Sequence, residues 1–318
     1  MRYGLVDEDI QPASHLEAQL GDDWTVTVGV EGTEEALIAA LDGVDVLFAT
    51  SRLPVTRRVL EATDLAVVSK IGTGLDNVDL EAAAELGIPV TYTPGFNALA
   101  VAEHTVALIL AVKRRVGHSQ DVLRAGGWRD DLPLGSMLTG DSVGIVGFGN
   151  VGRRVASLLN GFHPELLAHD PYVLEIDAEQ PGATFTDLPD LLARSDVVSI
   201  NAELTEETRH LIDADAFDRM KDDAVVVNTA RGEIIDQPAL IEALESGTIA
   251  GAGLDVFEDE PLPADSPFHG LESVVTTPHA AGLAIESRTR TMEILVRNTR
   301  SLLAGEPVPD HFMATSPG

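Results

Sequence analysis

The stretch Val143–Asp170 reads VGIVGFGNVGRRVASLLNGFHPELLAHD. Gly147, Gly149 and Gly152 form the spacing G-x-G-x-x-G directly after a short apolar strand expected at 142–146. In this spacing the first glycine permits a tight turn, the second lets a pyrophosphate approach the backbone, and the third lets a helix pack closely on the strand. The stretch therefore predicts a dinucleotide-binding turn.

The residues after the glycines support this prediction. An amphipathic helix is expected over 151–159, and its start offers unpaired N–H groups and the positive end of the helix dipole to phosphates. The next apolar run ends at Asp170, 23 residues after the first glycine, where a carboxylate can bind ribose hydroxyls. The alternative is an ordinary glycine-rich turn, but the order of strand, glycines, helix, strand and acid favours a dinucleotide site. The candidate cofactor contacts here are Gly147, Gly149, Asn150, Val151, Gly152 and Asp170.

The chain is strongly acidic. Its 318 residues include 52 Asp and Glu against 21 Lys and Arg, which gives a net charge of −31. Such a charge repels nucleic acid and anionic membranes, so neither is an expected partner. The acids are spread along the whole chain rather than gathered in an interaction tail. This pattern resembles halophilic proteins from salt-rich cytoplasm, where salt screens the self-repulsion.

Other features favour a cytoplasmic enzyme. The chain has no cysteine, so disulfides and thiolate metal sites are excluded. No apolar stretch approaches the ~18 residues of a membrane span, and acids at 7–9 argue against a signal peptide. No Asp, Glu or His set has convincing metal-ligand spacing, so no metal is expected.

Apolar periodicity predicts alternating strands and helices, which is typical of α/β proteins with parallel sheets. Expected strands are 3–6, 24–28, 44–49, 66–71, 89–92, 143–146, 166–169, 197–200, 224–228, 251–255 and 274–276. Expected helices include 12–20, 34–41, 55–61, 80–86, one long helix from 98 to about 123, 238–245 and 284–303.

This rhythm predicts two flavodoxin-like or Rossmann-like parallel-sheet domains with a cleft between them. The dinucleotide-binding domain is expected at 100–285. The substrate domain is expected at 1–99 plus 286–318, because the last helix can return to the first half. The cleft would be the natural site for a small molecule beside a dinucleotide.

Three side chains follow three successive strands, at the sheet edge where the cofactor is expected. Arg231 can hold a carboxylate with its planar fork, and His279 can exchange a proton near neutrality. Glu260 can accept a hydrogen bond from the far nitrogen of the imidazole ring. Taken singly, Arg231 could be a surface arginine, Glu260 a solvated acid and His279 a capping histidine. Together they predict reduction of a 2-oxo acid.

Several further motifs make the chain similar to the D-isomer-specific 2-hydroxyacid dehydrogenase family over essentially its whole length. The matching segments are 71–79 (IGTGLDNVD), 93–95 (TPG), 101–105 (VAEHT), the glycine motif, 228–232 (NTARG), 254–261 (LDVFEDEP) and 277–282 (TPHAAG).

The resemblance implies Arg231, Glu260 and His279 as the catalytic residues, with the backbone of Thr73 and Gly74 binding the substrate carboxylate. It also implies a homodimer paired through the cofactor domain, around 98–127. Further cofactor contacts are expected at Thr105, Ala230, Asp255 and Gly282, and the resemblance implies that Asp255 holds the nicotinamide carboxamide.

The sequence departs from the family at Asn201–Thr205, where a His-x-Pro-Leu-Thr stretch is usual. This loop borders the cofactor, so Asn201 could touch a ribose or the nicotinamide. Asp170 favours NAD because it should repel the 2′-phosphate of NADP, although Arg153 and Arg154 lie near it in sequence and leave NADP possible.

The expected function is therefore reversible hydride transfer between a nicotinamide dinucleotide and a small D-2-hydroxy acid. Alternatives on the same scaffold are a glyoxylate/hydroxypyruvate reductase and a phosphoglycerate or phosphite dehydrogenase. A dinucleotide-sensing corepressor is the alternative outside enzymes. The side chain of the substrate is not specified, because the pocket walls come from loops near Arg52, Phe96 and Met313.

Overall fold

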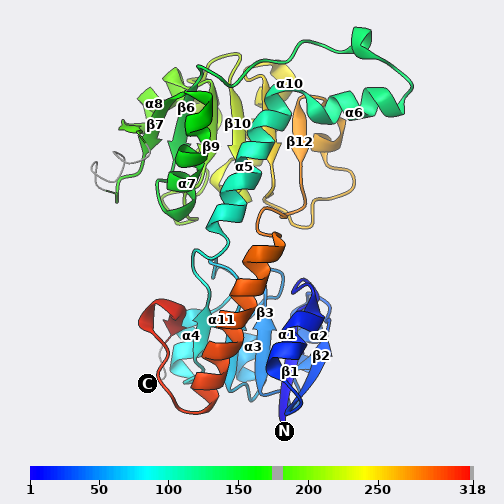
Figure 1. Cartoon of the computed structure of the whole chain (residues 1–318), viewed down its shortest axis with the longest axis vertical. Coiled ribbons are helices and arrows are strands. Elements are labelled where there is room, and N and C mark those ends of the chain that lie inside the picture. The colour runs from blue at the N-terminus through cyan, green and yellow to red at the C-terminus, as the bar shows by residue number, and fades with distance from the viewer. Residues whose placement is uncertain (174–181, 316–318) are drawn as a thin grey trace. The chain divides into compact units, whose positions relative to one another are not determined.

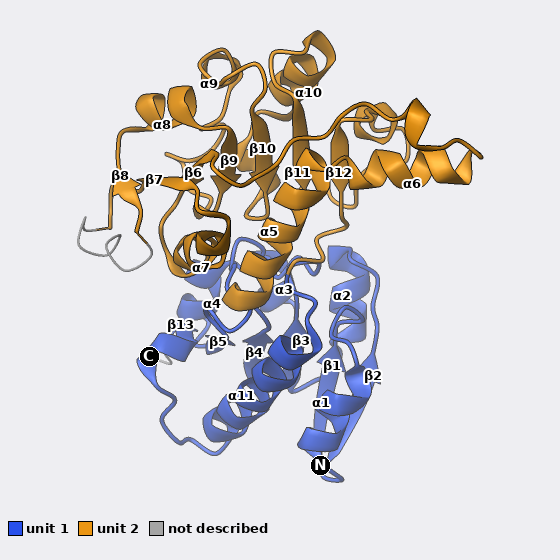
Figure 2. Ribbon diagram, turned by 45° about the horizontal axis from the view of Figure 1, so that its top comes forward, with its two compact units in different colours: residues 1–97, 282–318 blue, residues 98–281 orange. Residues whose placement is uncertain are grey.

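The computed structural model describes residues 1–173 and 182–315, which divide into two compact units (Figure 2). The first unit holds residues 1–97 and 282–318, and the second holds residues 98–281. Each unit is a parallel sheet with helices on both faces. The predicted fold class is therefore confirmed.

The sheet of the first unit has the order β13-β5-β4-β3-β1-β2. Strands β1 to β5 are parallel, in the flavodoxin-like order in which the first strand lies between the second and the third. Its strands are β1 (Arg2–Val6), β2 (Trp24–Val28), β3 (Val46–Ala49), β4 (Val67–Lys70), β5 (Val90–Tyr92) and β13 (Met313–Thr315). Its helices are α1 (Ala13–Leu20), α2 (Glu34–Ala40), α3 (Arg57–Glu61), α4 (Leu80–Glu85) and α11 (Ile285–Leu303).

The second unit has the parallel order β12-β11-β10-β9-β6-β7-β8 (Figure 1). The chain winds away from β6 in both directions, to β7 on one side and to β9 on the other. In such a sheet a ligand usually binds at the carboxyl ends of the two strands where the order reverses, here β6 and β9. Its strands are β6 (Ser142–Val146), β7 (Glu165–His169), β8 (Thr184–Phe185), β9 (Val197–Ile200), β10 (Val225–Asn228), β11 (Gly251–Leu254) and β12 (Val274–Thr276). Its helices are α5 (Ala98–Lys113), α6 (Val116–Arg124), α7 (Asn150–Leu159), α8 (Leu188–Arg194), α9 (Ala214–Phe217) and α10 (Gln237–Ser246).

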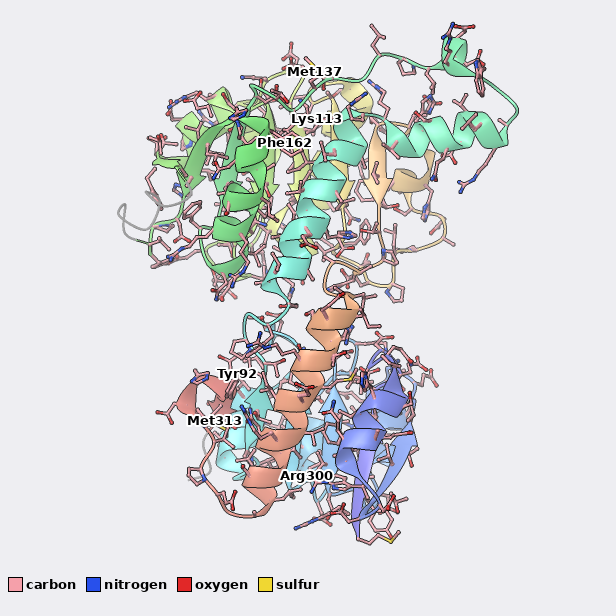
Figure 3. The ribbon with its side chains drawn as sticks, viewed as in Figure 1. Tyr92, Lys113, Met137, Phe162, Arg300 and Met313 are labelled. Atoms are coloured by element: carbon pink, nitrogen blue, oxygen red, sulfur yellow. The ribbon has the colours of Figure 1, made fainter. Side chains whose placement is uncertain are left out.

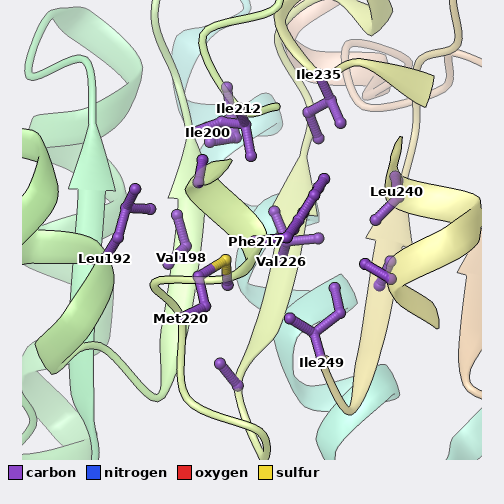
Figure 4. Packing of buried hydrophobic residues seen from close by; sticks show 14 of the residues in the cluster. Leu192, Val198, Ile200, Ile212, Phe217, Met220, Val226, Ile235, Leu240 and Ile249 are labelled. Atoms are coloured by element: carbon purple, nitrogen blue, oxygen red, sulfur yellow. The ribbon is translucent and has the colours of Figure 1, made fainter. Parts of the chain in front are cut away.

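Alternate strand residues of the second unit pack into two different apolar clusters. Val198 and Ile200 join Phe217 and Met220 on one face (Figure 4), whereas Val197 packs on the other face with residues of α5 and α7. Parallel strands buried on both faces need such continuous apolar runs. The helices thereby fix the strand tips, which carry the polar residues of the site.

One prediction about the helices was wrong. The expected single helix from 98 to about 123 is two helices, because Arg115 adopts a left-handed conformation with φ of 52°. The carbonyl of Lys113, labelled at the end of α5 in Figure 3, accepts a hydrogen bond from Ser136 N at 2.8 Å, and the Lys113 ammonium pairs with Asp141. The returning segment at Gly135 and Ser136 therefore occupies the place of the next helical turn.

The sequence also missed two short strands. Strand β8 has only two residues, and β13 (Met-Ala-Thr) lacks the pair of β-branched apolar residues that marks β12 (Val-Val-Thr), a strand of equal length. Strand β13 pairs antiparallel with β5, and it belongs to the segment that α11 brings back to the first unit.

Candidate active site

The glycine-rich turn after β6 has the geometry that each glycine was expected to provide. Gly147 has φ of 87°, and a Cβ added there would lie 2.4 Å from the backbone nitrogen of Ala202. A Cβ added at Gly152 would lie 2.2 Å from the carbonyl oxygen of Gly147, whereas one at Gly149 would meet nothing within 4 Å. Protein backbone therefore packs closely against Gly147 and Gly152, whereas the space beside Gly149 is open.

The start of α7 is suited to hold a pyrophosphate. Gly149 is its N-cap, and no side chain caps the first turn in the described part of the chain. Asn150 and Val151 are the first residues of the helix, so their N–H groups point out of its positive end. Phe148 between the glycines is fully buried and packs edge-on against Phe185, which anchors the turn. These residues fit a dinucleotide.

Asp170 lies beside this turn, at the end of β7. Its carboxylate accepts hydrogen bonds from the backbone nitrogens of Phe148 at 2.8 Å and Tyr172 at 2.9 Å. Arg153 donates to the carbonyl of Phe148 and Arg154 to that of Asn150. The carboxylate is thus held against the glycine loop by backbone donors.

His279 and Glu260 form a hydrogen-bonded pair. His279 Nδ1 lies 2.7 Å from Glu260 Oε2, and Glu260 Oε1 accepts from Phe257 N at 3.0 Å. Burial alone would raise the pKa of Glu260, but the hydrogen bond and charge of His279, the Phe257 amide and the charge of Arg231 lower it. Because an ionised carboxylate only accepts, Nδ1 carries a hydrogen and Nε2 remains for another partner.

Arg231 follows β10. Its Nη1 donates to the carbonyl of Ala230 at 2.7 Å, and its own carbonyl accepts from Asn228 Nδ2 at 2.8 Å. A Cβ added at Gly232 would lie 1.9 Å from the backbone carbon of Phe257, so the tips after β10 and β11 are in direct contact there. This packing brings Arg231 to the same edge as the Glu260 carboxylate, whose pKa responds to its charge.

Asp255 is fully buried and organises the turn that carries His279. Its carboxylate accepts from Thr277 Oγ1 at 2.5 Å and from the backbone nitrogens of Ala280 and Ala281, both at 2.8 Å. Burial would raise the pKa of Asp255, but hydrogen bonds from His104, Thr277 and these two amides lower it. In this structure Asp255 therefore has protein partners on both carboxylate oxygens.

The remaining predicted contacts of the second unit lie near the same strand tips. Thr105 is buried on α5, and its hydroxyl lies 2.7 Å from that of Thr229, the residue before Ala230. Asn201 follows β9; its Oδ1 accepts from Ser199 Oγ at 2.9 Å, while its Nδ2 is buried without a hydrogen-bond partner among the described residues. A buried unpaired donor at this edge also fits a polar ligand.

The predicted substrate contacts lie in the first unit. Thr73 and Gly74 follow β4, and Thr73 Oγ1 accepts from Gly95 N at 3.0 Å. Gly72, with φ of 96°, donates to Thr93 Oγ1 at 2.8 Å. Gly282 opens the segment that returns to this unit. The loop after β4 is thus held by two threonine hydroxyls.

Sequence reasoning assigned no role to His104, yet its Nε2 lies 2.9 Å from Thr277 Oγ1 and 3.5 Å from Asp255 Oδ1. The available signal was its position next to Thr105 on the helix that packs under the strand tips. His210 pairs with Glu258 at 2.9 Å. In the described ranges no group of His, Cys, Asp and Glu is arranged to hold a metal, and no helix is both long and apolar enough to cross a membrane.

A nucleotide-binding parallel sheet whose strand tips carry arginine and a histidine–carboxylate pair is the arrangement of a nicotinamide-dependent dehydrogenase. Residues 106–281 match the family described as D-isomer specific 2-hydroxyacid dehydrogenase, NAD binding domain. The chain therefore belongs to the D-isomer-specific 2-hydroxyacid dehydrogenase family, an NAD-dependent family of oxidoreductases that transfer hydride to and from 2-oxo and 2-hydroxy acids. The predicted family, cofactor and reaction class are confirmed.

Relatives of the chain act on different substrates. It is 40% identical over 285 residues to the glyoxylate reductase of Thermofilum pendens, which covers 87% of this chain and 84% of that protein. It is 39% identical over 300 residues to the D-3-phosphoglycerate dehydrogenase of Mycobacterium leprae, covering 94% of this chain but 56% of that protein. The crystal structure of D-lactate dehydrogenase from Aquifex aeolicus, complexed with NAD and lactic acid, matches with a TM-score of 0.87 and 27% identity, covering 99% and 100% of the two chains.

Proposed function

We propose that this chain reduces a small, unphosphorylated 2-oxo acid to the D-2-hydroxy acid, and catalyses the reverse reaction. The observation that carries the proposal is the His279–Glu260 pair, 2.7 Å apart, on the edge of the NAD-binding unit that also carries Arg231. This edge combines a proton donor with a cation for the substrate.

Each of the three residues has one task. Nε2 of His279 gives a proton to the carbonyl oxygen during reduction and takes it back during oxidation. Glu260 holds Nδ1, which fixes the orientation of the ring and stabilises the imidazolium. Arg231 binds the substrate carboxylate and polarises the carbonyl. The bound dinucleotide supplies the hydride.

The proposed cofactor contacts extend from the glycine turn to the strand tips. The pyrophosphate binds the start of α7 at Gly149, Asn150 and Val151, and the ribose hydroxyls bind Asp170. The proposed contacts near the nicotinamide are Thr105, Asn201, Ala230, Asp255 and Gly282. We propose NAD rather than NADP, because the Asp170 carboxylate would repel a 2′-phosphate while Arg153 and Arg154 donate to backbone carbonyls.

The glyoxylate reductase relative points to an unphosphorylated acid, and the D-3-phosphoglycerate dehydrogenase relative points to a phosphorylated one. The charges around Arg52 favour the unphosphorylated acid. Arg52 Nε and Nη2 donate to Asp7, its Nη2 also donates to the carbonyl of Val30, and Glu8 and Asp9 lie within ion-pair distance. Burial would lower the pKa of Arg52, but its hydrogen bond to Asp7 and the three acids raise it. Arg52, one of the residues expected near the pocket wall, is thus already paired with acids, and a phosphate beside it would meet a net negative cluster.

The test of the function is loss of NADH absorbance with a panel of glyoxylate, hydroxypyruvate, pyruvate and phosphohydroxypyruvate, repeated with NADPH. We expect turnover of the small unphosphorylated acids with NADH and little with the phosphorylated one. Phosphohydroxypyruvate as the preferred substrate would contradict the charge argument. Arg231→Ala should reduce kcat strongly and raise KM, and near-normal kinetics would contradict its assigned role.

We also propose that the chain is a homodimer paired through the second unit. Helix α6 and the segment after it project from the sheet in both views (Figures 1 and 2). Their exposed apolar side chains are Val116, Leu123, Trp128, Leu134 and Met137. Water-exposed apolar side chains grouped on one segment are typical of a surface that another chain covers. Sedimentation of the protein and of a Trp128→Ser/Leu134→Ser variant tests this, since only the variant should be monomeric.

The surface charge supports an enzyme adapted to a salt-rich cytoplasm. The 52 acids are dispersed, and the chain has three lysines, Lys70, Lys113 and Lys221. Salt screens distant carboxylates while leaving direct contacts with the substrate intact. KM for the anionic substrate should therefore fall as salt rises, and a flat or opposite trend would contradict this adaptation.

A further inference from the structure

The turn that carries His279 is held mainly by one side chain. His279 N donates to the Asp255 carbonyl at 2.8 Å, and Ala280 N and Ala281 N donate to the Asp255 carboxylate. His279 has φ of 51°, in the left-handed region that is unfavourable for residues other than glycine. The surrounding contacts must therefore hold the turn in this conformation.

The hydrogen bonds behind this turn can run in one direction only. Asp255 has a lowered pKa, so its carboxylate accepts, and the single hydroxyl hydrogen of Thr277 must point to Asp255 Oδ1. Thr277 Oγ1 can then only accept from its other neighbour, His104 Nε2, at 2.9 Å. His104 Nε2 must therefore carry a hydrogen.

Helix α5 thereby reaches two strand tips through adjacent residues. His104 bonds Thr277 after β12, and Thr105 bonds Thr229 after β10, the residue that precedes the Ala230–Arg231 tip. The His104 side chain is 25% exposed and that of Asp255 is fully buried, so water cannot easily replace the donor.

We infer that His104 is a positioning residue for the reaction, through the ordered chain from His104 Nε2–H to Thr277 Oγ1–H to Asp255 Oδ1. This chain fixes the Asp255 carboxylate in the orientation that receives Ala280 N and Ala281 N. The turn then presents the ring of His279 to Glu260 on one side and leaves Nε2 toward the substrate. The inference rests on the proposed function of His279, and it adds a residue that itself touches neither substrate nor cofactor.

Paired substitutions separate positioning from packing. His104→Phe keeps a ring of similar volume but removes the donor, whereas His104→Gln keeps an N–H at the position of Nε2. Thr277→Val removes the hydroxyl, and Thr277→Ser keeps it. A displacement of reacting groups by about 1 Å can reduce turnover on the order of a hundredfold, so we expect kcat to fall between about tenfold and a hundredfold in His104→Phe and Thr277→Val.

The pattern across kinetic constants and variants decides the inference. Substrate KM should change less than about threefold, and His104→Gln and Thr277→Ser should recover most of kcat. The double variant His104→Phe/Thr277→Val should be no slower than either single one, because both break one chain. The inference is wrong if His104→Phe keeps kcat, if His104→Gln loses as much as His104→Phe, or if the two losses multiply.

A spectroscopic measurement is independent of turnover. Nitrogen-15 NMR of the imidazole side chains should show a hydrogen on His104 Nε2, with the Nε2–H signal lost in Thr277→Val. A His104 ring without a hydrogen on Nε2 would overturn the inference even in an active enzyme. An unaltered protein that turns over none of the 2-oxo acids would instead refute the proposed function, and the tautomer would still test the hydrogen-bond chain.

Discussion

Replacing Gly152 by alanine is the sharpest test of the dinucleotide-binding turn. Gly152 is the third residue of α7 and is buried. An added Cβ would lie 2.2 Å from Gly147 O and 3.1 Å from Ile145 Cγ2, and contacts under 3.0 Å are essentially never made by a real Cβ. The start of α7 must therefore move away from β6 by at least about 0.8 Å.

The magnitude follows from two opposing effects. Overpacking of a close contact destabilises by about 1–3 kcal/mol, and moving α7 also loosens Val155 and Leu159, which are fully buried. Alanine has a helix propensity about 1 kcal/mol better than glycine. The net expectation is a destabilisation of about 0–2 kcal/mol, in which each 1 kcal/mol lowers Tm by about 2–4 °C for a unit of this size. Because the same movement displaces the N–H groups that face the pyrophosphate, NAD affinity should fall at least about tenfold, or about 1.4 kcal/mol.

The assay is urea unfolding together with calorimetric titration of NAD, with Gly161→Ala as the matched control. Gly161 lies just after α7, and a Cβ added there would meet nothing within 4 Å. The control should gain about 0.4–1 kcal/mol by restricting the unfolded chain and should bind NAD normally. If Gly152→Ala binds NAD as tightly as the control and is equally stable, close helix–strand approach is not the reason for glycine at this position.

Three further predictions concern stability. Lys113→Met should destabilise the protein by roughly 2–4 kcal/mol in urea titration, because the Asp141 carboxylate then loses the buried ammonium with which it pairs. The double variant Lys113→Met/Asp141→Leu should recover part of this loss. Hydrogen bonds hold the pKa of Asp255 and of Glu260 below their ordinary values. The stabilisation that these two carboxylates provide is therefore present above about pH 4 and is lost as pH falls through the lowered values. Glu260→Gln should lose less stability than the unaltered protein between neutral pH and pH 3, and an equal loss would contradict this. The melting temperature should fall on transfer from molar to millimolar salt, whereas an unchanged value would contradict the proposed salt adaptation.

The elements that could be predicted from the sequence are those fixed by local patterns. Strand and helix periods, and the glycine turn after β6, depend on residues close together in the chain, and they predicted both parallel sheets. The break at Arg115 and strand β13 could not be predicted in this way. The first depends on Ser136 and Asp141 meeting the end of α5, and the second pairs with β5 from more than two hundred residues away.

The same distinction holds for the candidate site. His279, Glu260 and Arg231 could be found because each follows a strand of one parallel sheet, so topology alone brings them to one edge. The environment of Asp255 could not be found, because its donors are a threonine, two amides and a histidine whose positions depend on the tertiary fold. His104 is 173 residues away from Thr277 in the chain, and nothing in its own neighbourhood indicates that bond.

The acidic charge of the chain and its anionic ligands are compatible because the acids at the site are already engaged. Asp255 accepts from a hydroxyl and two amides, Glu260 from an amide and an imidazole, and Asp170 from two amides. These contacts are direct, so salt leaves them intact, whereas the Debye length of about 3 Å in molar salt removes the field of dispersed surface carboxylates. We propose that an approaching anion then meets the start of α7 and the Arg231 guanidinium at this edge. High salt therefore leaves the attractive contacts in place while it screens the repulsion from the rest of the −31 surface.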